Sequence, residues 1–373
     1  MFLRKTLDLI TSRLNKGKVI ILIGARQVGK TTLTKDLLAL YPAGKTLVLN
    51  GDNYEAQRLS KMEGHEILEL IADYDCLLID EAHKVSRIGD IIKSMVDHYG
   101  KDKQIILTGS STVNLIDSTT EPLTGRKRVF ELYPISLPEY APEGLESSQE
   151  LHQLMLYGLY PEVLNEDDPQ DKLDALMELA ESSLYRDVLD VTGARASGDL
   201  VALLRYLASN IGETISINDA SIKLSIDRRT IDRYIDLLTK SFIVYTLMPY
   251  SRAGSIRRSY KVYFWDTGIR NALLEDFTPL DQRQDTDRLW QNFVISERLK
   301  AATYSQQLAQ HYFWRSYDGA EVDLVEQRGQ QIHGYRISWD GKNVRESQVF
   351  NDLSPTSQQV IEPDTLSLML DSA

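Results

Sequence analysis

The sequence has few of the features that mark secreted or membrane proteins. Its 373 residues contain a single cysteine, Cys76, so no internal disulfide framework is available, and an apolar strand around Cys76 favours a core position. The longest apolar runs are about five residues, well short of the ~20 that span a bilayer. The first five residues lack the apolar core and small-residue cleavage site of a signal peptide. We therefore expect a cytoplasmic protein that does not enter a membrane.

The sequence also has fewer basic than acidic residues. Acidic residues number 54 and basic residues 42, which gives a formal net charge of −12. This balance argues against a protein coated in nucleic acid, although a local basic patch can still bind it. Internal repeats and low-complexity segments are lacking. At ~150 residues per domain, the length suggests two or three domains.

The most informative stretch is residues 19–32. Five apolar residues, Val19 to Ile23, read as a buried strand, and Gly24 to Thr31 follows as G-x-x-x-x-G-K-T, the Walker A phosphate-loop pattern. The glycines allow a tight turn whose N–H groups face phosphate oxygens. Lys30 supplies a cation to the β- and γ-phosphates, and Thr31 offers a hydroxyl to Mg²⁺. The predicted nucleotide contacts in this loop are Gly24, Ala25, Arg26, Gln27, Val28, Gly29, Lys30, Thr31 and Thr32.

A chance glycine loop is the alternative interpretation of this stretch. It is disfavoured because a strand, a loop and a helix follow one another in the required order. The helix from Thr31 to Leu40 directs its positive N-terminal end at the same anion.

A second motif lies about 50 residues further on. Residues 75–79 form an apolar strand that ends in Asp80-Glu81. We expect Asp80 to lie in the Mg²⁺ shell and Glu81 to polarise the attacking water as a general base. The alternative for both acids is a plain strand-end cap. Thr108 and Ser110 end the next strand and either orient the same water or form an ordinary turn.

Arg126, in Leu123-Thr124-Gly125-Arg126, is the third catalytic candidate. One interpretation is an arginine that completes the γ-phosphate pocket of a neighbouring subunit. The other is a solvated charge run, since Lys127 and Arg128 follow it directly.

Strands alternate with helices over the first part of the chain, which predicts an α/β fold with a parallel sheet covered on both faces. The carboxyl ends of such strands meet at one edge, where ligands bind. We predict an ATPase domain over 1–145, a helical domain over 146–275 and a small α/β domain over 276–373. Within the second, residues 199–250 suggest three helices and a hairpin, as in a winged helix-turn-helix.

At this point the residues resemble a family, the bacterial and archaeal AAA-type ATPases that carry a C-terminal domain of unknown function, DUF4143. The resemblance covers nearly the whole chain. It rests on the two nucleotide motifs, on Leu107-Thr108-Gly109-Ser110-Ser111, on Leu123–Arg126 followed by Leu132–Ser136, and on Trp314–Ser316 with Gly319–Asp323.

The resemblance implies that the C-terminal domain has a restriction-endonuclease-like fold. Glu297 and Asp323 match its first two acids, but Arg336 and Ser338 stand where Glu-x-Lys is required. A cation in a carboxylate position repels the metal. We therefore expect a degenerate site that cuts nothing, unless an acid such as Glu326 rebuilds it.

The third helix of the winged unit begins with Arg228, Arg229 and Arg233, which suit a DNA groove or its phosphates. A second basic cluster, at the expected wing, comprises Arg252, Arg257, Arg258 and Lys261. The alternative is a winged fold that packs only against protein, and interspersed aspartates dilute the charge.

Taken together, the motifs predict an ATPase that binds and hydrolyses ATP with Mg²⁺, held by Thr31 and Asp80, and couples nucleotide state to conformation or assembly. The rival is an ATP-gated DNA-binding or regulatory protein with little turnover. The expected partners are ATP or ADP, with double-stranded DNA through the three arginines, and a second copy of the chain or another protein as further candidates.

Overall fold

The computed structural model describes residues 2–110, 123–192, 197–251, 259–317, 319–341 and 348–371. These form two compact units. The first comprises residues 1–134 and 240–242, and the second comprises 135–239 and 243–373. The three-domain boundaries predicted from sequence stay a prediction.

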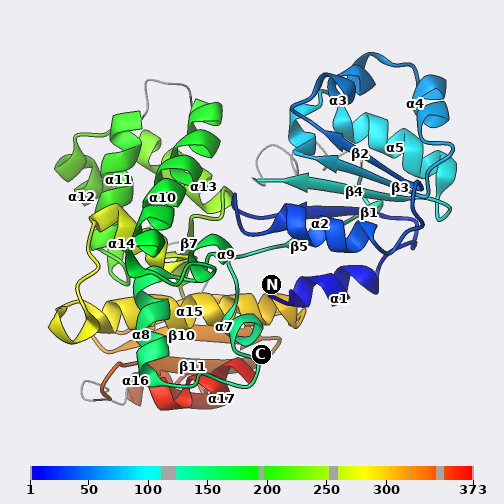
Figure 1. Cartoon of the computed structure of the whole chain (residues 1–373). Helices are drawn as coiled ribbons and strands as arrows, with labels where there is room; N and C mark the ends of the chain where they lie inside the picture. Colours follow the sequence, from blue (N-terminus) through cyan, green and yellow to red (C-terminus); the bar gives the residue numbers. More distant parts are fainter. Residues whose placement is uncertain are drawn as a thin grey trace. The chain divides into compact units, whose positions relative to one another are not determined.

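The first unit is built on a five-stranded parallel sheet in the order β2-β3-β4-β1-β5. Helices α1 and α2 lie on one face and α3, α4 and α5 on the other (Figure 1). The predicted α/β fold with a parallel sheet is therefore confirmed. The elements are α1 Lys5–Thr11, β1 Val19–Ile23, α2 Lys30–Leu38, β2 Thr46–Asn50, α3 Tyr54–Arg58, η1 Leu59–Lys61, α4 Gly64–Leu70, β3 Cys76–Asp80, η2 Ala82–Lys84, α5 Ile88–Tyr99, β4 Gln104–Gly109 and β5 Lys127–Glu131.

The strands of this sheet are apolar where they are central. Every residue of β1 is buried, as are all six of β4. Continuous apolar strands suit a sheet that is covered on both faces. Cys76 is buried in β3, as expected for a core residue. The two edge strands, β2 and β5, are more exposed.

The second unit begins with a helical part and continues into a small α/β part, again as predicted. Its helices are α7 Leu137–Tyr140, α8 Ser148–Tyr157, α9 Pro161–Leu164, α10 Pro169–Thr192, α11 Ser197–Ser209, α12 Ile217–Leu224, α13 Arg228–Lys240, α14 Thr267–Leu274, η4 Leu280–Gln282, α15 Thr286–Tyr304, α16 Gln348–Asn351, η5 Pro363–Thr365 and α17 Leu366–Asp371. Its strands are β6 Thr214–Ser216, β7 Val244–Pro249, β8 Ser259–Phe264, β9 Gln310–Arg315, β10 Glu321–Arg328, β11 Gln331–Ile337 and β12 Ser357–Ile361.

One seven-stranded sheet runs through this unit, in the order β12-β11-β10-β9-β7-β8-β6. Strands β7 and β9 join its two halves as a parallel pair, with Met248 opposite Tyr312. Helix α15 packs against β8 and β11. A strand from the helical part and a strand from the small α/β part therefore share one hydrogen-bonded sheet.

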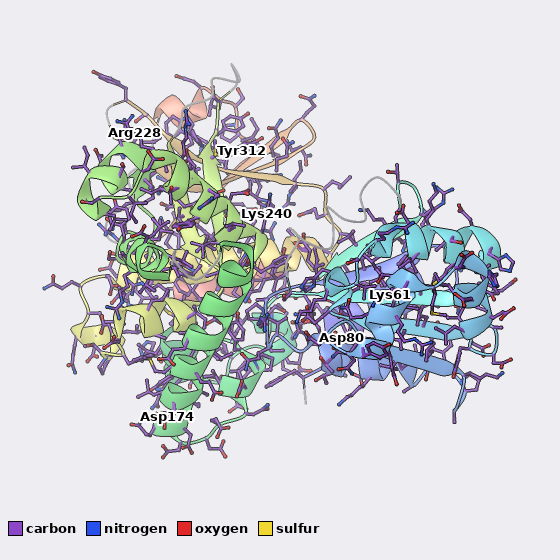
Figure 2. The ribbon with its side chains drawn as sticks, turned by 90° about the horizontal axis from the view of Figure 1, so that it is seen from above. Lys61, Asp80, Asp174, Arg228, Lys240 and Tyr312 are labelled. Atoms are coloured by element: carbon purple, nitrogen blue, oxygen red, sulfur yellow. The ribbon has the colours of Figure 1, made fainter. Side chains whose placement is uncertain are left out.

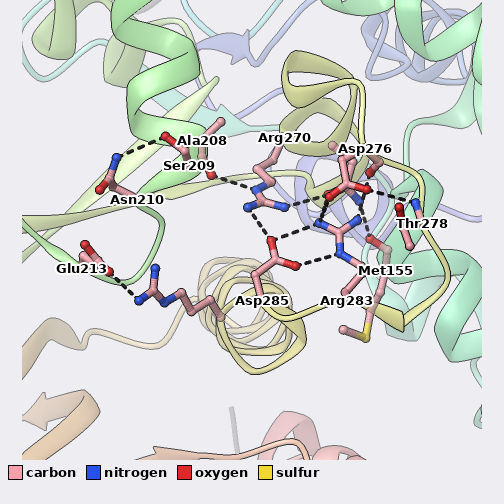
Figure 3. A network of polar contacts seen from close by, with 12 residues as sticks. Met155, Ala208, Ser209, Asn210, Glu213, Arg270, Asp276, Thr278, Arg283 and Asp285 are labelled. Atoms are coloured by element: carbon pink, nitrogen blue, oxygen red, sulfur yellow. Dashed lines mark hydrogen bonds and ion pairs between the residues drawn. The ribbon is translucent and has the colours of Figure 1, made fainter. Parts of the chain in front are cut away.

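A network of two buried arginines and partly exposed aspartates holds α14 to the start of α15 (Figure 3). Asp285 accepts from Arg283 at 2.8 Å and lies 2.6 Å from a guanidinium nitrogen of Arg270. Arg270 also donates to the carbonyl of Ala208, at the end of α11. Burial alone would raise the pKa of Asp285, but the hydrogen bond from Arg283 and the charge of Arg270 lower it to about 2. The connection between α14 and α15 is thus fixed by charge pairs rather than left as a flexible linker.

Candidate functional site

The phosphate loop connects β1 to α2, as the pattern predicts. Helix α2 begins at Lys30, and Gly29 is its N-cap with φ of +98°. This left-handed conformation costs a glycine little and strains other residues. The first-turn residues Thr31 and Thr32 are exposed. The first turn of α2 is therefore open to solvent beside the loop.

Position 24 requires glycine because another segment of the backbone passes close to it. A Cβ atom at this position would lie 2.0 Å from the backbone oxygen of Leu132. Leu132 follows β5 and donates its N–H to the carbonyl of Ile23 at 2.8 Å. Only glycine allows the chain after β5 to pass this close to the start of the phosphate loop.

Lys30 is directed into the loop. Its ammonium group donates to the carbonyl oxygens of Gly24 at 2.8 Å and Ala25 at 2.7 Å, and the residue is only 7% exposed. Of the other loop residues, Ala25 and Val28 are buried, whereas Gln27 is exposed and has φ of +59°. The lysine thus lies across the turn that the sequence assigns to phosphate.

Asp80, Glu81 and Thr108 are brought together at the ends of β3 and β4. The hydroxyl of Thr108 donates to the carboxylate of Asp80 and accepts from the backbone N–H of Glu81 at 3.2 Å. Strand β4 lies between β3 and β1, so these groups share the sheet edge with the phosphate loop. Figure 2 labels Asp80 at this edge. Thr108 is thereby a link between the two acids rather than only a turn residue.

Glu81 has a backbone conformation that is unusual for a glutamate. Its φ is +46° and its ψ +45°, and a Cβ on neighbouring Gly51 would lie 2.2 Å from its carbonyl oxygen. Strained residues of this kind concentrate at functional sites. One carboxylate oxygen of Glu81 lies 3.3 Å from Nδ1 of His83. His83 belongs to no sequence motif, and its only signal in the sequence is its position two residues after Glu81.

Ser110 is buried directly after β4, and Ser111 lies outside the described residues. Arg126 lies at the opposite ends of the strands, where their amino termini meet. Its carbonyl accepts from Val19, the first residue of β1, so it sits at the amino end of the strands and away from this chain's own phosphate loop. Its guanidinium pairs with Asp97 of α5 at 2.6 Å.

Mg²⁺ fits the oxygen groups at this edge. Among the described residues no group of three His, Cys, Asp or Glu side chains is placed to hold a metal by itself. Mg²⁺ in nucleotide sites needs only one or two protein oxygens, because phosphates and waters complete its shell. The Thr31 hydroxyl and the Asp80 carboxylate are hard oxygen ligands of this kind.

The helical region predicted to bind DNA has the expected order of elements. Arg228, Arg229 and Arg233 are exposed on α13, and Figure 2 labels Arg228 there. Asp227 accepts from the N–H of Arg229 at 2.9 Å, so it caps the N-terminus of α13. Arg252, Arg257 and Arg258 lie outside the described residues.

One basic residue of that region is not available to a ligand. Lys261 is 1% exposed and forms an ion pair with Glu321 of β10. The prediction that Lys261 belongs to an exposed basic wing is therefore wrong. Its position on β8, next to the sheet interior, buries its side chain.

Glu297 and Asp323, matched from sequence to the first two acids of a nuclease-like site, have separate partners in the structure. Asp323 accepts from the side-chain amide of Gln291 and, at 2.7 Å, from the N–H of Ile337. Glu297 is instead paired with Lys300 at 2.7 Å and accepts from the N–H of Leu137. Six residues separate Gln291 from Glu297 on α15, a spacing that places them on different faces of the helix. The residue beside Asp323 is thus a neutral amide.

Glu326 does not rebuild this centre either. Its carboxylate is held by Arg298 at 2.6 and 2.9 Å and by Arg328 at 2.6 Å. Burial would raise its pKa, but the hydrogen bonds from Arg298 and its other cationic neighbours hold the pKa well below the usual range.

Comparison with known proteins gives matches to three family models. Residues 16–141 match an AAA domain, residues 148–280 a domain of unknown function (DUF8612) and residues 286–365 a domain of unknown function (DUF4143). The predicted combination of an AAA domain with a C-terminal DUF4143 domain is therefore confirmed. The AAA match supports an ATP-binding protein of the AAA type.

Uncharacterized proteins of bacteria and archaea align with most of this chain. An uncharacterized protein of Mycobacterium tuberculosis is 26% identical over 329 residues, which is 87% of this chain and 71% of that protein. One from Haemophilus influenzae is 23% identical over 343 residues, covering 86% and 82% of the two chains. One from Methanocaldococcus jannaschii is 22% identical over 320 residues, covering 78% and 70%.

Similar solved structures include AMPPCP-bound DnaA from Aquifex aeolicus, at 16% identity and a TM-score of 0.31, covering 64% of this chain and 87% of that one. Drosophila ORC bound to AT-rich DNA and Cdc6 aligns at 10% identity and a TM-score of 0.28, covering 73% and 90%. Similarity at this level carries no argument about function. Within the described residues, no helix combines the length and apolar character that a membrane crossing requires.

Proposed function

We propose that the first unit binds ATP at residues 24–32 and hydrolyses it with Mg²⁺, and that nucleotide state changes the conformation or assembly of the chain. The observation that carries this proposal is the shared edge of β1, β4 and β3. Ile23 pairs with Gly109, and Ile79 with Leu107, so the phosphate loop, Thr108 and Asp80 follow adjacent strand ends.

Each residue of this edge has a role that its chemistry suits. Lys30 holds the β- and γ-phosphates as a cation, and the N–H groups of the loop bind their oxygens. Thr31 and Asp80 would hold Mg²⁺, which supplies charge neutralisation at the phosphates when bound. Glu81 accepts the proton of the attacking water as general base. Thr108 fixes Asp80 and the backbone of Glu81 relative to one another.

Arg126 is assigned to a neighbouring copy of the chain. It lies at the amino edge of the sheet, so it does not serve the phosphate loop of its own unit. An arginine supplied in trans stabilises the charge that develops on the transferred phosphoryl group. This assignment requires assembly of at least two chains during turnover.

The binding step is tested with Lys30→Ala. Removal of the cation that faces the β- and γ-phosphates should weaken ATP and ADP binding by more than tenfold, measured with a fluorescent nucleotide at equilibrium. Lys35→Ala is the matched control, because Lys35 lies on the same helix and is exposed. Equal affinity in the wild type and in Lys30→Ala would refute the assignment of the phosphate loop.

A second candidate function, DNA binding by a winged-helix unit at α11 to α13, is favoured by one observation. Arg228, Arg229 and Arg233 are exposed, and none forms an ion pair with a carboxylate of the described residues. Cations left to solvent on one helix suit phosphate contacts. Exposed Asp227, Asp232 and Asp236 reduce the net charge of this surface.

This candidate predicts a salt-dependent affinity for double-stranded DNA. Replacing the three arginines by alanine should weaken binding and flatten the plot of log affinity against log salt by about 0.9 for each lost contact. Arg205→Ala serves as control, since Arg205 is paired with Glu275, which directly follows α14. No detectable binding of the wild type at low salt would exclude this function.

A further inference from the structure

Arg4 is a residue that the nucleotide motifs do not include, yet it contacts the phosphate loop. It precedes α1 and is half-buried. Its guanidinium donates to the carbonyl of Val28 at 2.8 Å and to the carbonyl of Tyr133 at 2.6 Å. These two oxygens are more than 100 residues apart in the sequence. Arginine is suited to such a link, because its planar fork presents several donors in fixed directions.

The contact with Val28 sets the direction of a phosphate-binding group. In a trans peptide, the carbonyl of one residue and the N–H of the next point in opposite directions. With the Val28 oxygen turned toward Arg4, the N–H of Gly29 is turned away from it. Gly29 is also the N-cap of α2, with φ of +98°. Arg4 thus holds one of the loop's amide donors in a fixed orientation.

The contact with Tyr133 connects the loop to the place where the chain leaves the first unit. Tyr133 is followed by Pro134, the last residue of the unit's main segment. Leu132 lies against the loop as well, because its oxygen occupies the space left by the missing side chain of Gly24. The exit segment therefore touches the loop near its start, through Leu132, and near its end, through Arg4.

In the second unit, the chain that follows Pro134 is also fixed. Lys300 donates to the carbonyl of Ile135 at 3.3 Å, and Glu297 accepts from the N–H of Leu137. Glu297 and Lys300 are both buried on α15. Within the second unit, the segment that begins at Ile135 is therefore held by side chains of α15.

We propose that Arg4 is a positioning residue that orients the Val28–Gly29 peptide for phosphate and couples phosphate occupancy to the backbone at Tyr133 and Pro134. The proposal rests on the proposed ATP site and names a regulatory connection of that site. Coupling of this kind is reciprocal: if phosphate changes the Arg4–Tyr133 link, loss of the link changes phosphate affinity.

The test uses the full chain with Arg4→Ala, Arg4→Lys and, as matched control, Arg13→Ala. Arg13 follows the same helix and is exposed. Arg4→Ala should weaken ATP binding about tenfold, in line with the loss of a charge-assisted hydrogen bond. Arg4→Lys should also weaken it, because one ammonium group lacks the fork that joins two carbonyls. Guanidinium ion, added below its denaturing range, should restore part of the affinity of Arg4→Ala, whereas sodium at equal ionic strength should not.

Hydrogen–deuterium exchange measured by mass spectrometry distinguishes nucleotide binding at the phosphate loop from its coupling to the segment around Tyr133. In the wild type, a non-hydrolysable ATP analogue should protect residues 24–31 and change exchange in residues 131–137. In Arg4→Ala at saturating analogue, protection of 24–31 should remain and the change in 131–137 should disappear. Protection of 24–31 without any change in 131–137 of the wild type overturns the coupling, as does a change that persists in both Arg4 variants. No protection of 24–31 in the wild type refutes the ATP site itself.

Discussion

The two units each contain a cluster of acidic residues, and the surroundings of the carboxylates differ between the two clusters. In the first unit, Asp80 and Glu81 lie at the end of β3, at the same sheet edge as the exposed residues Thr31 and Thr32, and Glu81 has a left-handed backbone conformation. In the second unit, the carboxylate of Asp323 is bound by the side chain of Gln291 and a backbone N–H. Both centres follow acid patterns in the sequence. The first leaves polar groups accessible for a ligand, whereas the second satisfies its carboxylate with protein donors.

The difference lies in the partners that the fold supplies. A carboxylate whose oxygens already accept hydrogen bonds from neutral donors, with cations nearby, is a poor ligand for a divalent ion. Burial raises the pKa of Asp323 to about 6, although the charges of Lys261 and Arg336 act in the opposite direction. The inactivity of this centre toward DNA stays a prediction.

The largest effect is expected at the first centre, with Glu81→Gln. The amide keeps the size of the side chain and its position near His83 but cannot take a proton. ATP should still bind, while hydrolysis should fall by the ~10²–10⁴ associated with a general base. Phosphate release and nucleotide affinity are measured on the same preparation, with exposed Glu55→Gln as control. Unchanged turnover would make Glu81 an ordinary strand-end acid.

The next effect concerns the free energy of unfolding and is expected from a buried ion pair of the second unit. Arg298 and Glu326 are both fully buried and joined by two hydrogen bonds. Arg298→Met should lower the free energy of unfolding by roughly 3–5 kcal/mol, because a buried carboxylate loses its main partner. The four tryptophans, Trp265, Trp290, Trp314 and Trp339, all belong to this unit, so their fluorescence during urea unfolding reports it alone.

A double variant separates the charge from the packing. Arg298→Met with Glu326→Met removes both charges and should recover much of the lost stability, since apolar replacements of buried pairs are often neutral. A double variant that is as unstable as the single one would show that the shape of the two side chains matters more than their charge.

A smaller, pH-dependent effect is expected from Asp323. Its folded-state pKa of about 6 exceeds the ordinary value of 3.8, so its protonation favours the folded state at low pH. This contribution is present below pH ~4 and is lost as pH rises through 6, with a size of roughly 2–3 kcal/mol. Asp323→Asn should therefore show a smaller loss of stability between pH 4.5 and pH 7.5 than the wild type. Exposed Asp352→Asn should leave the pH profile unchanged, and a wild-type profile in Asp323→Asn would contradict the assignment.

The smallest effect is expected at the surface of the first unit. Arg126 and Asp97 are 38% and 45% exposed, and exposed ion pairs contribute at most ~1 kcal/mol. Asp97→Asn should change the midpoint of urea unfolding, followed by circular dichroism, by little more than the error. A large loss would show that Arg126 has a structural role, which would weaken its assignment to a neighbouring subunit.

Much of the first unit follows from the sequence because its signals are local. A buried strand, two glycines and a lysine at fixed spacing predict the strand, loop and helix at residues 19–38, and Asp80 at a strand end predicts its position at the same edge. The N-terminal caps of α12 and α13 can also be read from the sequence, since Ser216 and Asp227 lie directly before these helices. Local chemistry of this kind needs few distant contacts.

Tertiary structure alone decided the contacts between distant residues. The sequence could not show that Arg4 reaches Val28 and Tyr133, that Lys261 is buried against Glu321, or that Gln291 rather than Glu297 faces Asp323. Each depends on the register of a helix or strand against another element, and a shift of one residue turns a side chain to a different face. Short motifs in the sequence indicate which functional groups are present. Tertiary packing between distant segments decides which residues contact those groups.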